Sequence, residues 1–293
     1  MSASAHRRAL ALMLLSAASF TANVLLVRAL DNLHFANIWL VSCARFLVGL
    51  GVVAVVYRRE WQPLHLVRNP RLIERGLLGG IGVYLTYLCV VKLGAGRATF
   101  INNTYVIWGA LLAAWVLREK LRPSLLVGGV GALTGLALLT NVLGGGNAPG
   151  PYDGLAVLSA LVSAWVVVTI RQLHASEHSS TIFAAQCFYG LLICGIPALL
   201  QLQPISGLGL AVTAIASVTA AVGQLAMTRA FRDLSVAEGS LLQMLVPVGI
   251  AVGGVVFFHE RFTTHELIGA ALILGGTTFI ALRQPIRANA EAE

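Results

Sequence analysis

Two stretches of the chain decide how it folds: LREKLRPSLLVGGVGALTG at residues 117–135 and FHERFTTHELIGAALILGG at residues 258–276. They align without a gap at an offset of 141 positions, the difference between 117 and 258. In each stretch a glutamate, Glu119 or Glu260, closes one apolar run nine residues before a glycine inside the next run. This placement indicates an internal repeat, although glycine and leucine also match by composition alone in apolar chains.

The composition around these stretches excludes a water-soluble protein. Of 293 residues, 57% are apolar and only 11% are charged, whereas soluble domains carry roughly 25% charged residues. The net charge is +8. Cysteines lie inside apolar runs without CxxC spacing, which indicates neither a disulfide framework nor a metal site; they are Cys43, Cys89, Cys187 and Cys194.

Ten stretches are apolar over a length that suits a bilayer-spanning helix. Their length and lack of period-2 alternation exclude the strands of a barrel. The first could be mistaken for a signal peptide, but it continues far enough to span and is expected to be retained. The predicted spans are residues 9–29, 36–57, 72–92, 97–117, 124–141, 153–173, 180–201, 207–230, 236–258 and 265–283.

The basic residues predict the orientation of these spans. With the N-terminus inside, the inner segments carry fifteen Lys and Arg residues, Arg75 among them, and the outer segments carry four. The positive-inside rule then places both termini in the cytoplasm. This asymmetry explains the high net charge without a nucleic-acid partner.

Each repeat holds five predicted spans, so the second must enter the membrane inverted relative to the first. The halves are residues 1–147 and 148–293, separated near a glycine- and proline-rich linker. In transporters built from inverted repeats, the substrate site lies near the bilayer midplane between the halves. The sequence therefore predicts an all-α membrane protein of ten helices that works by alternating access.

The paired motif, with the segment Cys43-Ala44-Arg45-Phe46 in the second span, resembles the drug/metabolite transporter superfamily and its EamA-type repeat. The aromatic content of the third, fourth and sixth spans is most similar to bacterial aromatic amino acid exporters of the YddG type. The resemblance implies a multi-pass inner-membrane exporter of amino acids, aromatic or otherwise neutral, or of related metabolites. It implies no cofactor and a monomer or weak homo-oligomer.

Polar and aromatic groups within the spans are the candidates for a substrate cavity, because such side chains avoid lipid. Asn102, Tyr105 and Trp108 share a face of the fourth span, and Gln243 aligns with Asn102 in the second half. Interfacial aromatic belts and hydrogen bonds between packed helices remain alternatives. The predicted set is Tyr84, Tyr87, Asn102, Tyr105, Trp108, Trp165, Gln224, Ser240 and Gln243.

Other residues are expected to shape the fold or its movement. Arg45 is a charge well inside a span and is assigned a structural or gating role, with binding of a substrate carboxylate as the alternative. Glu119 and Glu260 are expected to hold tight turns, and Pro247 is a candidate hinge. The spacing Gly131-x-x-x-Gly135 predicts close helix packing.

The acidic residues, Glu238 included, lie at predicted span ends or in loops, which favours transport without a carboxylate proton relay. No nucleotide-binding glycine loop is present. The pairs His259-Glu260 and His265-Glu266 lack the spacing of a zinc protease, so an intramembrane enzyme is disfavoured. A channel, a sugar carrier or a drug carrier of the same superfamily remain alternatives.

Overall fold

The computed structural model describes residues 3–32, 38–93, 95–119, 123–140, 142, 150–201, 205–259 and 263–282. Over these residues the chain forms helices and connecting turns, with no strand among them. The helices are α1 (Ala3–Asn32), α2 (Ile38–Val56), α3 (His65–Arg68), α4 (Pro70–Leu93), α5 (Ala95–Asn103), α6 (Tyr105–Val116), α7 (Pro123–Leu139), α8 (Pro151–Leu173), α9 (Ser179–Leu200), α10 (Gly207–Ala230), α11 (Val236–Gln243), α12 (Leu245–Phe258) and α13 (Thr264–Leu282).

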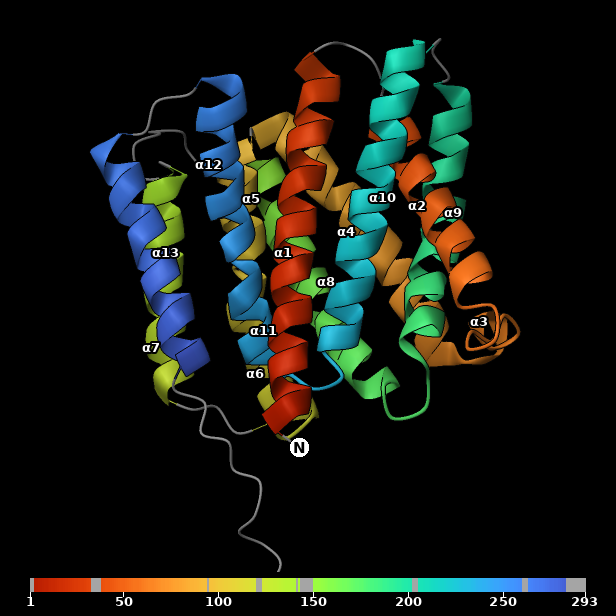
Figure 1. Ribbon diagram of the computed structural model, residues 1–293, viewed down its shortest axis with the longest axis horizontal. Coiled ribbons are helices and arrows are strands. Elements are labelled where there is room, and N and C mark those ends of the chain that lie inside the picture. Colours follow the sequence, from red (N-terminus) through yellow and green to blue (C-terminus); the bar gives the residue numbers. More distant parts are fainter. Residues whose placement is uncertain are drawn as a thin grey trace, which may run out of the picture.

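The long helices run up and down side by side as a bundle (Figure 1), and helix covers most of each of the ten predicted ranges. The helix α7 is apolar but shorter than a typical span. Seven stretches among the described residues are long and apolar enough to cross a bilayer: Ser4–Leu30, Trp39–Val56, Pro70–Cys89, Pro151–Leu173, Ser179–Leu200, Gly207–Ala230 and Val236–Phe258.

Two of the ten predicted ranges are interrupted, at Thr104 and at Met244. At the first break, the side chains of Asn103 and Thr104 donate to the carbonyls of Thr99 and Ile101, at 2.8 Å and 2.7 Å. Such bonds offer the backbone an alternative to the helix. At the second break Pro247 has no N–H, so the carbonyl four residues earlier loses its helical partner.

The distribution of apolar residues is that of a protein in lipid. Large side chains cover the outside, where Val55, Leu200 and Phe257 are each more than two-thirds exposed. Small residues and hydroxyls fill the contacts between helices, as is typical of membrane bundles. Fully buried examples are Ala156, Ala160, Ala164, Ala216, Ala220, Ser16, Ser159 and Ser240.

The helices α7 and α13 meet through their glycines at one flank of the bundle (Figure 1). A Cβ built on Gly135 would lie 2.6 Å from the carbonyl oxygen of Gly269, and one on Gly269 would lie 2.5 Å from that of Gly135. One on Gly276 would lie 3.0 Å from the Gly128 oxygen. Because Gly135 contacts Gly269 while Gly128 contacts Gly276, the two helices are antiparallel. Gly131 faces open space, so the predicted Gly131-x-x-x-Gly135 contact involves Gly135 alone.

A second reciprocal contact joins α2 to α9. Gly49 packs against the Cys187 side chain, and Gly190 packs against the ring of Phe46. The offset of 141 that aligns the repeats converts residue 46 into 187 and residue 49 into 190. The same pair of positions is therefore used twice, with the roles of the two helices exchanged.

The turns after α6 and α12 also match. Among the described residues other than glycine, Arg118 and His259 alone have positive φ, 54° and 55° respectively. They are equivalent at the same offset, as residue 118 becomes 259. This left-handed conformation ends helices and is strained for side chains other than glycine. The repeated motif thus encodes a repeated turn, although Glu260 lies outside the described residues.

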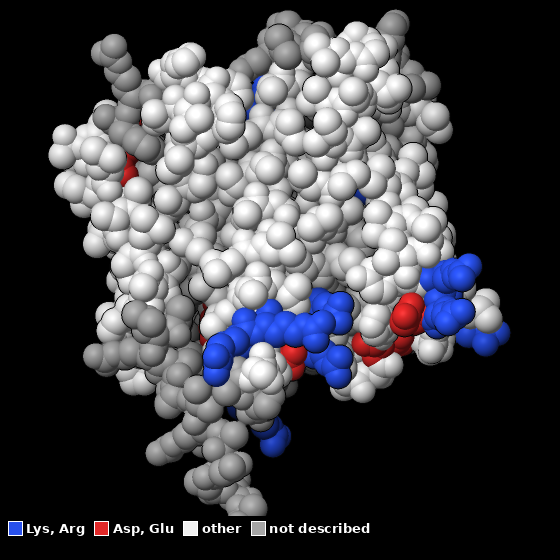
Figure 2. Space-filling model, viewed as in Figure 1, with Lys and Arg blue, Asp and Glu red and all other residues white. Residues whose placement is uncertain are grey.

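Lys and Arg gather along one edge of the molecule, below a wall that is almost free of charge (Figure 2). It is the edge at which α1 begins in Figure 1, where Arg7 and Arg8 are exposed. Under the positive-inside rule this edge is expected to face the cytoplasm.

The glycine contact of α7 with α13 yields a test with an internal control. We expect Gly135→Ala to cost roughly 1–3 kcal/mol, because its Cβ would meet a backbone oxygen and the helices must separate. Gly131→Ala on the same helix meets nothing within 4 Å and is expected to leave stability unchanged. The measurement is the Tm of each variant in detergent. Equal Tm values for both variants would contradict the contact.

Candidate functional site

The predicted cavity residue Asn102 takes part in a polar chain between three helices. Ser159 of α8 donates to Asn102 Oδ1 of α5 at 3.0 Å, and the Ser159 and Thr86 hydroxyls lie 3.1 Å apart. Thr86, on α4, also donates to the Gly82 carbonyl at 2.8 Å. This chain joins helices α1 to α7, called the first segment, to helices α8 to α13, called the second segment.

From the second segment, Gln243 bonds a serine of the first segment, here as the donor. Its Nε2 lies 2.8 Å from Ser16 Oγ and 2.9 Å from Met13 Sδ, both on α1, and the side chain is buried. Ser240 is also buried on α11, with Tyr105 of α6 beside it. The two aligned amides, Asn102 and Gln243, therefore each bond a serine of the opposite segment.

Two arginines cross between the segments through glutamines. Arg45 of α2 donates from Nη2 to Gln224 Oε1 of α10 at 3.2 Å, and its guanidinium lies 5.9 Å from the centre of the Phe20 ring. Arg75 of α4 donates from Nη2 to Gln186 Oε1 of α9 at 2.9 Å. Arg45, for which the sequence predicts a structural or gating role, thus contacts the second segment.

Arg75 was not expected in the interior, because its position near a span end counted it among the cytoplasmic basic residues. The structure corrects this, since Arg75 is fully buried. The signal in the sequence is Gly79 one turn later, since a Cβ there would lie against Arg75 Nη1.

The predicted aromatic residues do not converge on one cavity. Tyr84 stacks on Trp39, with ring centres 4.7 Å apart, and the Trp165 indole donates to Glu74 Oε1. Tyr87 is half-buried, and Trp108 is 40% exposed on the outside of α6. Trp108 therefore fits a lipid-facing position better than a binding site.

Glu119 joins three helix ends at the edge where Lys and Arg gather, called the basic edge. Its Oε2 accepts from the Val236 N–H at 3.1 Å, at the start of α11, and its Oε1 lies 3.5 Å from Arg171 Nε. Arg171 also donates to the carbonyls of Phe231 and Arg232. A carboxylate at a helix N-terminus is favoured by the unpaired N–H groups there, so Glu119 links its own segment to the ends of α8 and α11.

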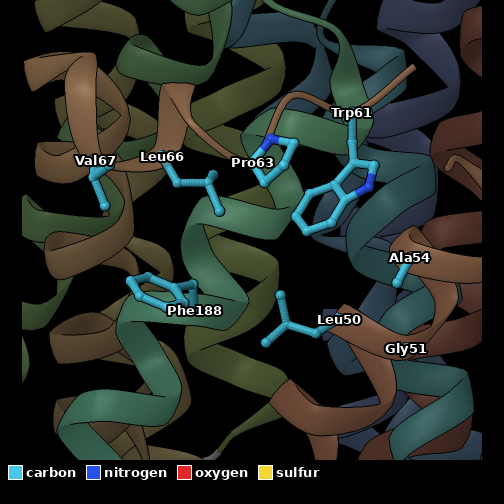
Figure 3. A pocket seen from close by; sticks show the side chains of 8 residues that line it. All are labelled: Leu50, Gly51, Ala54, Trp61, Pro63, Leu66, Val67 and Phe188. Carbon is cyan, nitrogen blue, oxygen red and sulfur yellow. The ribbon is translucent and has the colours of Figure 1, made fainter. Parts of the chain in front are cut away.

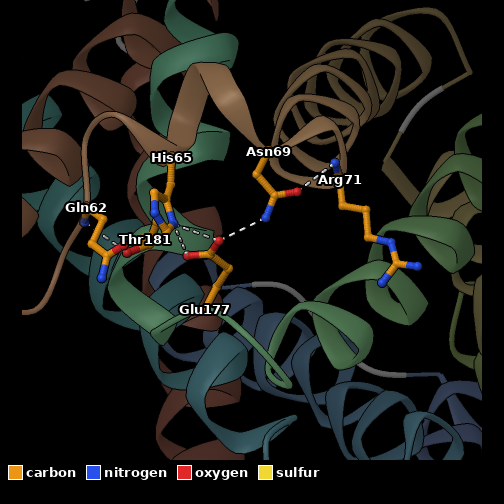
Figure 4. Close-up of polar contacts among 6 residues, drawn as sticks. All are labelled: Gln62, His65, Asn69, Arg71, Glu177 and Thr181. Atoms are coloured by element: carbon orange, nitrogen blue, oxygen red, sulfur yellow. Dashed lines mark hydrogen bonds and ion pairs between the residues drawn. The ribbon is translucent and has the colours of Figure 1, made fainter.

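The segment between α2 and α4 is held against the start of α9 by a second carboxylate, Glu177. Figure 4 shows His65 and Asn69 pointing at Glu177 from α3 and its end. His65 Nδ1 lies 3.0 Å from Glu177 Oε1, and Asn69 Nδ2 donates to the same oxygen at 2.8 Å. The Gln62 N–H adds a bond to Thr181 Oγ1 at 3.2 Å.

An apolar cavity of about 440 Å³ lies beneath this segment (Figure 3). None of the side chains predicted from sequence lines it. Its walls come from α2, α9 and the connecting segment: Leu50, Gly51, Ala54, Trp61, Pro63, Leu66, Val67 and Phe188.

A contact between a histidine and a buried carboxylate joins α1 to α11. Glu238 Oε1 lies 3.3 Å from His6 Nε2, and the Glu238 side chain is 3% exposed. Glu238 does lie in the first turn of its helix, as expected, with Ser235 Oγ capping its N–H at 3.2 Å. It is nevertheless enclosed by protein and not by water.

Comparison with known proteins identifies the class. The sequence profile of the EamA-like transporter family matches residues 7–141 and again residues 151–282. The chain belongs to the EamA-like transporter family, and it is a multi-pass membrane transporter.

Two relatives are similar over nearly the whole chain. An uncharacterized protein of Pseudomonas aeruginosa is 27% identical over 290 residues, covering 94% of each chain. A solved crystal structure of a protein superposes with a TM-score of 0.73 at 18% identity, covering 96% of this chain and 99% of the other. At that identity the second likeness shows a shared fold alone.

Removal of the Glu119 charge tests whether its contacts with Val236 and Arg171 stabilise the protein. We expect Glu119→Gln to cost about 1 kcal/mol, because it weakens the bond to the start of α11 and removes the ion pair with Arg171. The matched control is Glu60→Gln, at an exposed loop carboxylate. The two Tm values in detergent provide the measurement, and a Glu119→Gln variant as stable as the control would argue against the role.

The pH dependence of stability is set in part by His174, whose Nε2 lies 2.7 Å from the Thr228 carbonyl. Burial lowers the pKa of His174, and Arg171 and Arg232 lower it further against the opposing Thr228 carbonyl and Asp233. A lowered pKa in the folded state means that this contribution to stability is present above the ordinary histidine pKa of about 6.5 and is lost as the pH falls.

We therefore expect the Tm of the wild-type protein to drop between pH 7.5 and pH 5.5 by more than that of His174→Gln, in which no charge can form. Both proteins are measured in the same detergent. Parallel pH profiles would show that His174 carries no such linkage.

Proposed function

We propose that this chain is an inner-membrane exporter of amino acids, aromatic or otherwise neutral, or of related metabolites. It works by alternating access between two inverted five-helix halves, residues 1–147 and 148–293. The observation that carries this proposal is the reciprocity of the contacts between the first and second segments.

The pattern of helix contacts supports a two-fold arrangement. Helix pairs come in equivalents at the offset of 141: α1 packs on α10 as α8 packs on α4, and α1 packs on α12 as α8 packs on α6. The pairs α2 with α9 and α7 with α13 are each their own equivalent, with the glycine contacts exchanged. A two-fold axis that relates antiparallel helices lies in the membrane plane, which is the symmetry of an inverted repeat.

The broken helices support a site at the membrane midplane. The interruptions at Thr104 and Met244 fall at nearly equivalent positions, directly after the polar stretches with Asn102 and Gln243. Transporters of inverted symmetry commonly bind solute where helices are discontinuous, because free backbone groups and polar side chains are available there. Amides suit the ammonium and carboxylate of an amino acid, since they both donate and accept.

Transport is proposed to proceed without a carboxylate relay at mid-membrane. Among the described residues, the acids lie within the first two turns of a helix, in the last turn of α1 (Asp31) or in connecting segments. The buried pair His6 and Glu238 lies at the basic edge, and it is the place where proton coupling would be sought.

The test uses sealed liposomes that contain the purified full-length protein. We expect saturable uptake of labelled phenylalanine and leucine, accelerated by unlabelled amino acid preloaded inside and unaffected by a pH gradient. Empty liposomes are the control. Uptake that never saturates and shows no counterflow would indicate a channel, and no movement of any amino acid would contradict the substrate class.

Uptake driven by a pH gradient would instead refute the uncoupled mechanism. In that case Glu238→Gln identifies whether the buried pair carries the proton, because the amide keeps the shape of the side chain and cannot titrate.

A further inference from the structure

Arg75 is a buried cation whose hydrogen bonds are incomplete. No part of the residue reaches solvent, and it lies in the second turn of α4, roughly 8 Å along the helix from Pro70 at 1.5 Å per residue. Its Nη2 donates to Gln186. Its Nε and Nη1 have no acceptor among the residues that the structure describes.

A buried guanidinium ordinarily needs an anion. It has five N–H groups, and burial of an uncompensated charge is costly enough that buried charges are normally paired. The hydrogen-bonded partner of Arg75 is the neutral amide of Gln186. This bond recovers little of the hydration free energy that burial of the charge removes. The N–H groups of Arg75 that have no acceptor therefore favour the binding of an anion.

Arg45 adds a second positive charge nearby. It lies one turn before Gly49 on α2, and Gly49 packs against Cys187, the residue that follows Gln186 on α9. Among the described residues, the side chain of Arg45 donates to Gln224 and that of Arg75 donates to Gln186. Two cations thus share the protein interior with no carboxylate bonded to either.

The two arginine bonds join equivalent helix pairs, α2 with α10 and α9 with α4, and Arg45 aligns with Gln186 at the offset of 141. Arg75 and Gln224 do not align, because the offset converts residue 75 into residue 216. Both bonds join the first segment to the second, so any separation of the segments breaks or remakes them.

We propose that Arg75 and Arg45 form a carboxylate-binding site between the two segments. The carboxylate of the solute accepts from the Arg75 N–H groups that have no acceptor, and Arg45 supplies the second charge. This inference rests on the proposed transport function and narrows it: the solute carries a carboxylate, and a cation without one is rejected by the two positive charges.

Because Arg75 is buried, binding of a carboxylate to it is coupled to movement of the helices. A solute reaches Arg75 only when α4 and α9 move apart, because Gly80 and Gly190 bring their backbones into contact. A carboxylate that then satisfies the guanidinium removes the cost of enclosing it when the segments close. A ligand shifts a conformational equilibrium by its difference in affinity for the two states, so the carboxylate favours the closed state.

The first experiment needs only the wild-type protein in detergent and measures the Tm with four related probes. We expect 3-phenylpropionate and phenylalanine to raise the Tm in a saturable way, since ligands that bind the folded state stabilise it. Phenylalanine methyl ester and phenethylamine, which lack the carboxylate, are expected to leave it unchanged. An equal shift from the ester and the acid would overturn the site.

The second experiment changes the site. We expect Arg75→Gln to weaken binding of 3-phenylpropionate by about 10- to 100-fold, the range of a charge-assisted hydrogen bond. Gly79→Ala is expected to act in the same direction without removing a charge, because its Cβ would displace the guanidinium. The controls are Arg71→Gln, an exposed arginine one turn earlier, and Gly82→Ala, whose Cβ meets Val162 at an ordinary 3.4 Å.

Failure of the site and failure of the proposed function are distinguishable. If amino acids show counterflow but Arg75→Gln and Gly79→Ala bind and transport them with unchanged affinity, the carboxylate site is wrong and the transport function stands. If no amino acid moves but the Tm shift requires both the carboxylate and Arg75, the site stands and the amino acid assignment falls.

Discussion

Hydrocarbon offers neither a donor nor an acceptor, so a polar atom between these helices needs a partner from the protein itself or from a bound solute. That constraint decides where the two segments touch: Asn102 ends on Ser159, Gln243 on Ser16 and Arg45 on Gln224. Water-soluble proteins assemble by burial of large apolar side chains. Here many large apolar side chains face outward. Amides, hydroxyls and close approaches at glycine join the helices beside an apolar interior that includes Phe46 and Phe231.

The apolar runs predicted the positions of the helices well, because the length needed to cross a bilayer is a strong local constraint. Local pattern predicted less where partners are distant. The burial of Arg75 depends on Gln186, 111 residues away, and equal spacing made Gly131 look equivalent to Gly135 although only the second faces another helix. The break at Thr104 depends on which side chains reach backbone carbonyls, which composition does not show.

The basic edge combines two kinds of charge. Exposed arginines such as Arg7 and Arg8 suit the headgroup side of a membrane. Enclosed carboxylates, Glu119 and Glu177, instead bind loops and helix ends from both segments. The first kind orients the protein in the bilayer. The second joins helix ends and connecting segments of the two halves at that edge.

Both arginines that donate to glutamines between the segments, Arg45 and Arg75, come from the first segment, and both glutamines come from the second. A pair built from two copies of the first segment would bring Arg45 of one copy to the place that Gln186 holds here, opposite Arg75 of the other. Two guanidiniums would then face each other in a medium of low dielectric, where like charges repel strongly. Joining unlike segments in one polypeptide excludes that assembly, and charge selects the partner that shape alone would not distinguish.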